Sequence, residues 1–427
     1  MRIAKLIHVL GSFAIALCIA SAPSAMLAQS KKDKEKAKND AAGTIDQQTG
    51  KKLQAAYDAY QGTPPVYSAP NLNASKAALD TIKQGEGDLS PYELGRVHQL
   101  YAAIAQQQER IDDARTHLNK AIASGGLNAQ EMLDTRFQIA QLFLVQEKWK
   151  EGAAALEAWI AQTPKPNSNA YYMLAIAYYQ MGDERRALPP AEKALAIAEK
   201  PQASWIQLVL ALYLKNDQFA KAEPLVRRLI AMEPEKKQHW IQLSAVLGQQ
   251  EKYDDALVAL TLAYHKGLIT GDAELRRLAD LMAFNNIPYR CGTMLTKELA
   301  AKRLDEKDPA LYEKLSNCWV AAREWDKAIT PLRRAAEMKR SGDLFTRLGE
   351  VQVQRANWAG AVEALRKALE MGNARDPGNA QILLGMSYYN LKKPQEARQW
   401  FQRAMSTRHA KQAEGWIRAI DVEGGAS

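Results

Sequence analysis

Apolar residues recur along most of this chain at the spacing of amphipathic α-helices, in pairs separated by short polar turns. The clearest pair occupies residues 309–338, where a turn at Arg323 and Glu324 divides two predicted helices. The apolar faces consist of Tyr312, Leu315, Ser316 and Trp319 in the first helix and of Trp325, Ala328, Leu332 and Ala335 in the second. We predict that the two helices cross at Ala328, because a larger side chain there would hold them apart.

A small residue equivalent to Ala328 recurs at intervals of 33 to 38 residues. Its positions are Ala114, Gly152, Ala187, Ala222, Ala256, Gly292, Ala328, Ala361 and Ala397. This period resembles that of tetratricopeptide (TPR) repeats, in which each unit is a helix-turn-helix hairpin that packs on its neighbours. The sequence therefore predicts an all-α TPR solenoid of about ten hairpins in a right-handed superhelix.

The regular array is predicted to cover residues 90–407, between two less regular ends. Residues 49–89 are expected to form a capping hairpin, in which Asn73 or Ser75 caps the second helix and Ala77 is the small crossing residue. We expect residues 408–427 to form a C-terminal capping helix and tail, which cover the last open face of the array.

No stretch alternates between apolar and polar residues as a half-buried strand does, so no sheet is expected. Every tryptophan lies in a repeat or in the terminal helix. We interpret these residues as core packing.

The first residues have the order of a secretory signal peptide. Arg2 and Lys5 precede an apolar run over residues 6–22, and small residues follow as far as Ala28. We expect residues 1–28 to be removed and the mature protein to lie in the periplasm. The alternative is an uncleaved membrane anchor. Residues 29–48 are rich in lysine and poor in large apolar residues, which predicts a charged flexible linker.

Composition fits a folded protein rather than a disordered one, with 47% hydrophobic and 25% charged residues. The formal net charge of +9 raises the question of a nucleic-acid partner. Lysine and arginine are spread over predicted helix faces, and no nucleic-acid-binding motif accompanies them. We therefore expect no nucleic-acid partner, and membrane association only through partner proteins or an uncleaved signal segment.

No arrangement of residues indicates catalysis. The six histidines are scattered one at a time, and none belongs to a metal-ligand motif such as HExxH. There is no GxSxG motif and no Walker A loop. We expect no enzymatic activity, no cofactor and no metal.

The repeat phase instead predicts a recognition surface on the first helices of the hairpins. Amide, phenol and charged side chains at these positions suit hydrogen bonds to the main chain of an extended peptide. The predicted concave-face residues are Gln138, Gln141, Tyr172, Tyr179, Gln207, Gln242, Asn317, Arg347, Glu350, Tyr389 and Asn390. The simpler interpretation of any single member is a hydrated surface residue.

Two cysteines, Cys291 and Cys318, follow the predicted signal peptide. They are expected at the same edge of two successive hairpins, where an oxidising periplasm would allow a disulfide. The alternative is a pair of buried free thiols that act as small core residues.

Several stretches of the second half resemble a narrower group, the periplasmic TPR proteins associated with TonB–ExbB–ExbD energy-transduction systems. They read YHKGLIT at 264–270, ELRRLA at 274–279, NIPY at 286–289, WVAAREWDKAI at 319–329 and DPGNAQILLG at 376–385. The resemblance implies a non-catalytic scaffold that serves TonB-dependent transport, with TonB, ExbB or ExbD as partners.

Two other functions stay open. One is a scaffold for envelope assembly, in outer-membrane protein insertion or peptidoglycan synthesis. The other is an enzyme with an unrecognised site in the irregular sixth repeat, near residues 285–291. The second would require a pocket with strongly perturbed titratable groups.

Overall fold

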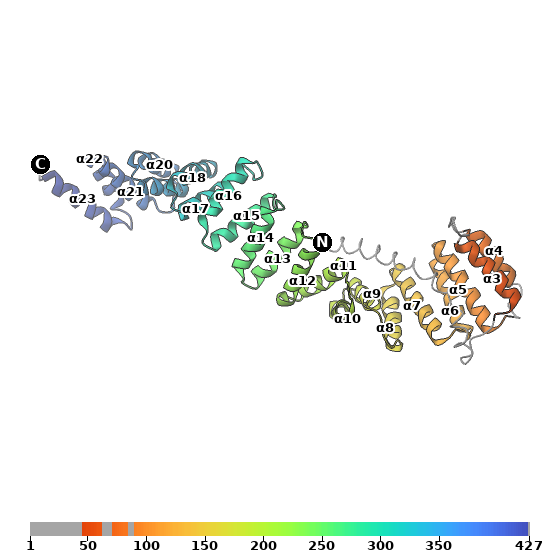
Figure 1. Ribbon diagram of the computed structural model, residues 1–427. Coiled ribbons are helices and arrows are strands. Elements are labelled where there is room, and N and C mark those ends of the chain that lie inside the picture. The colour runs from red at the N-terminus through yellow and green to blue at the C-terminus, as the bar shows by residue number, and fades with distance from the viewer. Residues whose placement is uncertain (1–44, 62–70, 84–88, 426–427) are drawn as a thin grey trace. The chain divides into compact units, whose positions relative to one another are not determined.

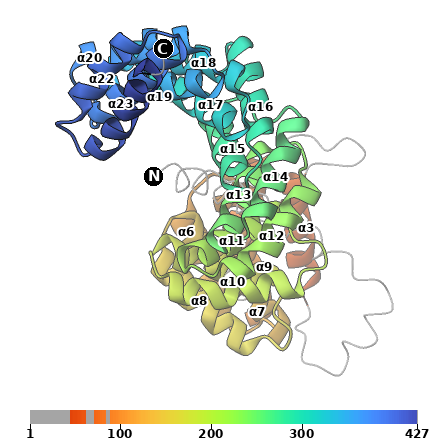
Figure 2. The same ribbon diagram turned by 90° about the vertical axis from the view of Figure 1, so that its left-hand side faces the viewer.

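The computed structural model describes residues 45–61, 71–83 and 89–425, and every regular element in these ranges is an α-helix. The chain divides into two compact units, the first ending at Gln218 and the second beginning at Phe219. In each unit, helices that follow one another in the sequence pack side by side (Figures 1 and 2). The predicted all-α fold of repeated helical hairpins is confirmed.

The helices of the first unit are α3 (Gln47–Gln61), α4 (Leu72–Lys83), α5 (Pro91–Gln107), α6 (Ile111–Ala123), α7 (Ala129–Val145), α8 (Trp149–Gln162), α9 (Ser168–Gln180), α10 (Glu184–Ile197) and α11 (Ala203–Lys215). Those of the second unit are α12 (Phe219–Met232), α13 (Lys237–Gln249), α14 (Tyr253–His265), α15 (Asp272–Phe284), α16 (Pro288–Ala300), α17 (Pro309–Ala321), α18 (Trp325–Lys339), α19 (Gly342–Gln354), α20 (Trp358–Met371), α21 (Pro377–Asn390), α22 (Pro394–Ala404) and α23 (Ala410–Gly425). From α5 to α22, each odd-numbered helix is the first helix of a repeat, and the even-numbered helix after it is the second.

The turn before the second helix has the same left-handed backbone conformation in nine repeats, with a φ between 54° and 74°. The residues in this conformation are Glu109, Glu147, Gly182, Asp217, Glu251, Asn286, Arg323, Ala356 and Lys392. The N–H of the next residue donates to a carbonyl five residues back, at 2.8 to 3.0 Å, as Glu324 does to Trp319. This hydrogen bond pairs a carbonyl that the end of a helix leaves open, so it holds the turn even where the residue is not glycine.

All nine of the predicted small residues are buried. Each is the fourth residue of its second helix, except in α16, where Gly292 is the fifth. Glycine is required at two of these positions, because a Cβ there would clash with a neighbouring side chain. A Cβ added to Gly152 would lie 2.3 Å from the Leu144 side chain, and one added to Gly292 would lie 2.6 Å from the Trp319 ring. The repeat phase predicted from the sequence is therefore the phase of the folded chain.

The start of α4 differs from the prediction. The helix begins at Leu72, and Asn71 caps it, because the Asn71 side chain accepts a hydrogen bond from the N–H of Ala74 at 3.0 Å. Neither Asn73 nor Ser75 caps the helix, since both lie inside it.

The small crossing residue of this first hairpin is Ser75, and the assignment to Ala77 was wrong. Ser75 is the fourth residue of α4 and is fully buried, whereas Ala77 is exposed. The Ser75 hydroxyl donates to the carbonyl of Ala56 on α3 at 2.7 Å. This bond satisfies a polar group that burial would otherwise leave unpaired.

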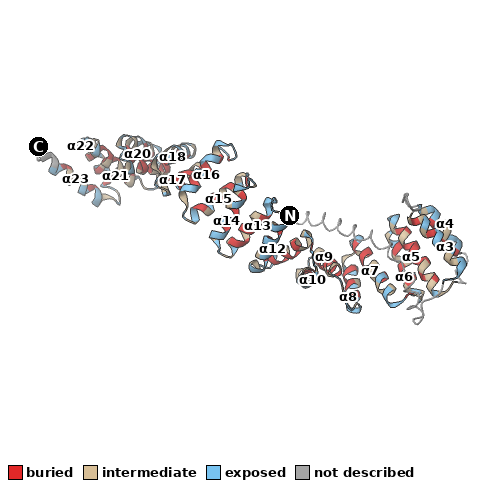
Figure 3. Cartoon of the chain, viewed as in Figure 1, coloured by how far each residue is buried: buried red, intermediate tan, exposed pale blue. Residues whose placement is uncertain are grey.

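The interpretation of the tryptophans as core packing also fits partly exposed members, since Trp240, Trp325, Trp400 and Trp416 pack against buried clusters. Trp159 and Trp319 are buried, and the other seven are half-buried. Figure 3 shows that buried residues follow the sides of helices that face other helices. A tryptophan is larger than this narrow contact face, so most of the rings extend to its solvent-exposed edge.

The last helix packs on the array as expected. Ala413 and Ile420 of α23 are buried, and the Trp416 ring stacks on Phe401 of α22 with ring centroids 5.6 Å apart. Asp376, which caps α21, also pairs with His409 just before α23, at 2.9 Å. Burial would raise the pKa of Asp376, but hydrogen bonds from His409 and Arg408 lower it to about 2.

The predicted signal peptide and most of the predicted linker lie outside the described residues. The last two residues of that linker, Gln47 and Gln48, are already helical in α3. Within the described ranges, no helix has both the length and the apolar character needed to span a membrane.

Replacing Ala328 tests the crossing directly. Ala328 is fully buried, so we expect Ala328→Trp to lower the free energy of unfolding by roughly 1–3 kcal/mol or more through overpacking. Glu337→Trp is the matched control, because Glu337 is exposed on the same helix. Urea titration followed by circular dichroism measures both variants. Equal midpoints for the two would show that the crossing is assigned incorrectly.

Candidate functional site

All eleven predicted recognition residues lie on first helices, from α7 to α21. Nine of them are half-buried or exposed and are accessible to a partner. The structure corrects the other two. Gln141 is only 9% exposed and Tyr172 only 6%. Tyr172 is buried because its ring stacks on Trp205 of α11, with centroids 4.6 Å apart.

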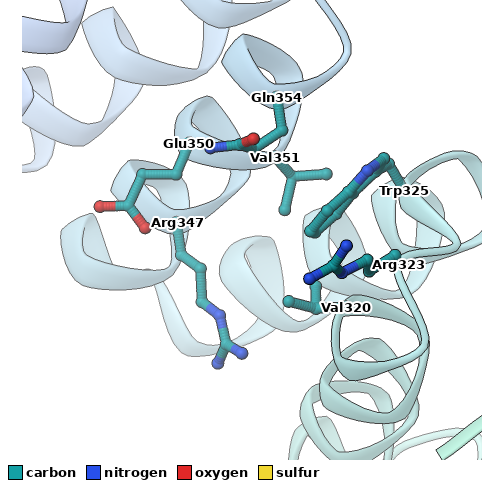
Figure 4. A pocket seen from close by; sticks show the side chains of 7 residues that line it. All are labelled: Val320, Arg323, Trp325, Arg347, Glu350, Val351 and Gln354. Atoms are coloured by element: carbon teal, nitrogen blue, oxygen red, sulfur yellow. The ribbon is translucent and has the colours of Figure 1, made fainter.

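Two of the predicted residues, Arg347 and Glu350, meet at a cavity of about 610 Å³ in the second unit. We call it the α17–α19 cavity, after the helices that bound it. Its lining residues are Val320, Arg323, Trp325, Arg347, Glu350, Val351 and Gln354. In Figure 4, Trp325 and Arg323 lie beside each other, and Val351 points toward the Trp325 ring from α19.

The repeat fold places each side of this cavity. Arg323 is the left-handed residue of the α17–α18 turn, and Trp325 is the first residue of α18. Arg347 and Glu350 lie three residues apart on α19, so their side chains share one face of that helix. Glu350 accepts a hydrogen bond from Asn379 of α21 at 2.9 Å, which orients its carboxylate.

The cavity combines an apolar centre with polar groups of both kinds. Arg323 and Arg347 carry donors only, Glu350 carries acceptors, and Gln354 carries both. Such a set can bind the side chain of a partner residue against the Trp325 ring and pair with its main chain or its carboxylate. The sequence analysis missed Arg323 and Trp325, which it assigned to a turn and to the core. The predicted turn at Arg323 and Glu324 was the available signal, because the residues of a connection between two helices lie at the protein surface.

The sixth repeat, α15 and α16, gives no support to an enzyme. Its most buried titratable group is Glu298, which is fully buried and hydrogen-bonded to Arg303 and Tyr264. The Arg303 hydrogen bond lowers the pKa of Glu298, and burial together with Glu298 raises the pKa of Tyr264 to about 12. Each partner stabilises the ionised carboxylate, which is the arrangement of a structural ion pair.

Two histidines that the sequence separates are brought together. The Nδ1 atoms of His98 on α5 and His117 on α6 lie 3.1 Å apart. Three or more ligands are needed for a typical protein metal site. Within the described part of the chain, no group of three histidine, cysteine, aspartate or glutamate residues can hold a metal.

Cys291 and Cys318 lie next to each other on α16 and α17. Their Cα atoms are 5.8 Å apart and their sulfur atoms form a disulfide. Both residues are buried, at 0% and 3% exposure. The bond joins the second helix of one repeat to the first helix of the next.

The comparisons with known proteins agree with this repeat architecture. The tetratricopeptide-repeat family profile matches residues 137–204, 212–267 and 346–412. None of the curated proteins matches the sequence.

Three solved structures illustrate the likeness. MamA is 20% identical with a TM-score of 0.34, covering 42% of this chain and 96% of its own. A tetratricopeptide repeat protein from Parabacteroides merdae is 12% identical with a TM-score of 0.34, covering 69% and 99%. YrrB, described as a TPR protein with an unusual peptide-binding site, is 14% identical with a TM-score of 0.35, covering 43% and 89%.

The disulfide has a direct test. We expect protein purified without reductant, alkylated under denaturing conditions and digested, to yield a linked peptide pair containing Cys291 and Cys318. Closing a loop of this size would stabilise the fold by roughly 3 kcal/mol, so reduction should lower the thermal midpoint. Mass spectrometry decides the question, and full alkylation of both cysteines before reduction would rule the bond out.

Proposed function

We propose that this chain, in which residues 137–204, 212–267 and 346–412 match the tetratricopeptide-repeat profile, is a non-catalytic scaffold that binds segments of other proteins. The observation that carries the proposal is the α17–α19 cavity. Two residues that the repeat phase assigned to a recognition surface, Arg347 and Glu350, meet there with Arg323 and the Trp325 ring. A half-buried tryptophan beside arginines has the composition of a binding hot spot.

The chemistry of the cavity favours a protein ligand. An extended segment has free main-chain N–H and C=O groups, and the cavity offers partners for both. Glu350 can accept from a main-chain N–H, while Arg323 and Arg347 can donate to a carbonyl or to a carboxylate. The half-exposed polar residues on the other first helices extend the same chemistry to further repeats, each within its own unit.

We further propose that the protein acts in the periplasm as an accessory of a TonB-dependent transport system. Two features of the sequence support this. Residues 1–28 have the order of a signal peptide, and several stretches between residues 264 and 385 resemble TPR proteins associated with TonB, ExbB and ExbD. In this role the cavity would hold a segment of one of those three proteins. The protein would thereby keep parts of the transport complex together.

A photoreactive amino acid placed at position 347 tests the scaffold in intact cells. We expect crosslinks from this position to TonB, ExbB or ExbD, and far fewer from position 366, an exposed arginine on α20 outside the cavity. Arg347→Ala should lower the affinity for the captured partner about tenfold, as hot-spot residues do, and Arg366→Ala should leave it unchanged.

The possible outcomes test the scaffold role, the TonB assignment and the binding role of the cavity separately. Capture of outer-membrane insertion or peptidoglycan proteins from position 347 would support the scaffold and overturn the TonB assignment. An absence of crosslinks from position 347, or equal crosslinking from both positions, would overturn the binding role of the cavity. Deletion of the gene should impair growth on a TonB-dependent nutrient, and normal growth on all of them would contradict the transport role.

A further inference from the structure

A second concave surface lies in the second unit and shares no lining residue with the α17–α19 cavity. We call it the α16–α18 groove. It encloses about 850 Å³ and is lined by Tyr289, Thr293, Thr296, Lys297, Leu299, Tyr312, Leu315, Trp319, Lys327, Thr330, Pro331 and Arg334. These residues come from one face each of α16, α17 and α18, at helical spacing. The helices α16 and α18 form the walls, and α17 forms the floor.

The floor is rigid and aromatic. Trp319 is 5% exposed, and its ring lies over Gly292, where a Cβ would approach it to 2.6 Å. Tyr289 meets the Trp319 ring edge-on, with centroids 5.7 Å apart. The disulfide between Cys291 and Cys318 ties the α16 wall to the α17 floor beside these rings. The groove is therefore formed before any ligand arrives.

The α16 wall offers little to a ligand's main chain. The hydroxyls of Thr293 and Thr296 donate to the carbonyls of Tyr289 and Gly292, at 2.9 and 2.7 Å. Their donor protons are thus used inside the helix. The hydroxyl oxygens of the lining threonines and tyrosines can still accept, but the lining holds no carboxylate or amide acceptor, so an extended peptide would lose water from further N–H groups that gain no partner, which costs free energy. A helical ligand has no such cost, because its main chain is already paired.

The charges on the groove have one sign. Lys297 lies on one wall, Lys327 and Arg334 lie on the other, and no carboxylate is among the lining residues. The ammonium of Lys327 lies 4.8 Å from the centre of the Trp319 ring and pairs with Glu324 at 3.1 Å. Among the described residues, neither Lys297 nor Arg334 forms a salt bridge. An apolar ligand with acidic flanks complements this pattern.

We propose that the α16–α18 groove binds an amphipathic α-helix of a partner protein, apolar on one face and acidic on both sides of that face. The wall from Tyr289 to Ala300 spans about 16 Å, which matches three turns of a helix and anchors at i, i+4 and i+7. The chain's own lysine-rich segment, residues 31–38, has the wrong charge to occupy the groove. The protein thus has two docking surfaces of different chemistry, one for extended segments and one for acidic helices.

Three synthetic helical peptides of 15 residues test the proposal with the full chain. The first carries leucines at i, i+4, i+7 and i+11 flanked by glutamates. The second replaces the glutamates with lysines, and the third keeps the glutamates but replaces the leucines with glutamines. Fluorescence anisotropy should show that the first binds at least about fivefold more tightly than either of the others, with an affinity that falls as salt rises.

Matched variants locate the binding. We expect Lys297→Gln combined with Arg334→Gln to weaken the first peptide on the order of fivefold. The control pair, Lys302→Gln with Arg333→Gln, removes the same charge from exposed or half-exposed positions outside the groove and should have no effect. All four side chains are at least partly exposed, so circular dichroism should show unchanged folding.

Several outcomes would overturn the proposal. They are no binding of the glutamate peptide, equal binding of the lysine peptide, and equal effects of the groove and control variants. Saturable binding of dodecanoate that the groove variants weaken, without binding of the glutamate peptide, would assign the groove to fatty-acid-like anions instead. The groove variants leave the lining of the α17–α19 cavity unchanged, so their effect is distinguishable from the crosslinking at position 347.

Discussion

The close approach of two helices at one small residue is the constraint on which this structure depends. In nine repeats, the fourth or fifth residue of the second helix is alanine or glycine and is buried. In the eight of these repeats that lie within one unit, the turn just before that residue holds the helices at the crossing, through one left-handed residue and one hydrogen bond to a carbonyl five residues back. A left-handed conformation costs an ordinary residue about 1–2 kcal/mol, and eight of the nine turns use a residue other than glycine. Packing on both sides of the turn offsets that cost.

Both proposed docking surfaces follow from this repeated geometry. Arg323 lies in the turn between α17 and α18 and Trp325 begins α18, and both residues line one side of the α17–α19 cavity. The same repeat places Trp319 against Gly292, which makes the floor of the α16–α18 groove. The glycine at position 292 leaves room for the Trp319 ring of the next repeat, beneath a surface that a ligand can reach.

The repeat architecture could be predicted from the sequence because a helix crossing accepts only small residues, and their recurrence is visible without a structure. The recurrence of small residues did not reveal Ser75. Serine often caps a helix and was interpreted in that way, but the Ser75 hydroxyl pairs with a buried carbonyl. The sequence pattern also failed to tell buried from accessible side chains on the first helices. Tyr172 was placed on the surface, but the neighbouring Trp205 covers it, and a contact between repeats leaves no periodic signal. The two docking surfaces are formed by contacts between neighbouring repeats. The sequence therefore indicated Arg347 and Glu350 but not the other residues that line the two surfaces.

Hydrogen exchange at the turn amides tests the central claim most directly. The N–H of Glu324 donates to the carbonyl of Trp319 at 2.9 Å, and eight equivalent amides make the same bond. These amides lie outside the helices, but we infer that their hydrogen bonds hold the hairpins together. Residue-resolved exchange of the full chain should show these nine amides protected as strongly as amides inside the adjoining helices. Exchange at the rate of an unprotected loop in most of the nine turns would contradict the account, because the hairpins would then lack the bond that sets their crossing.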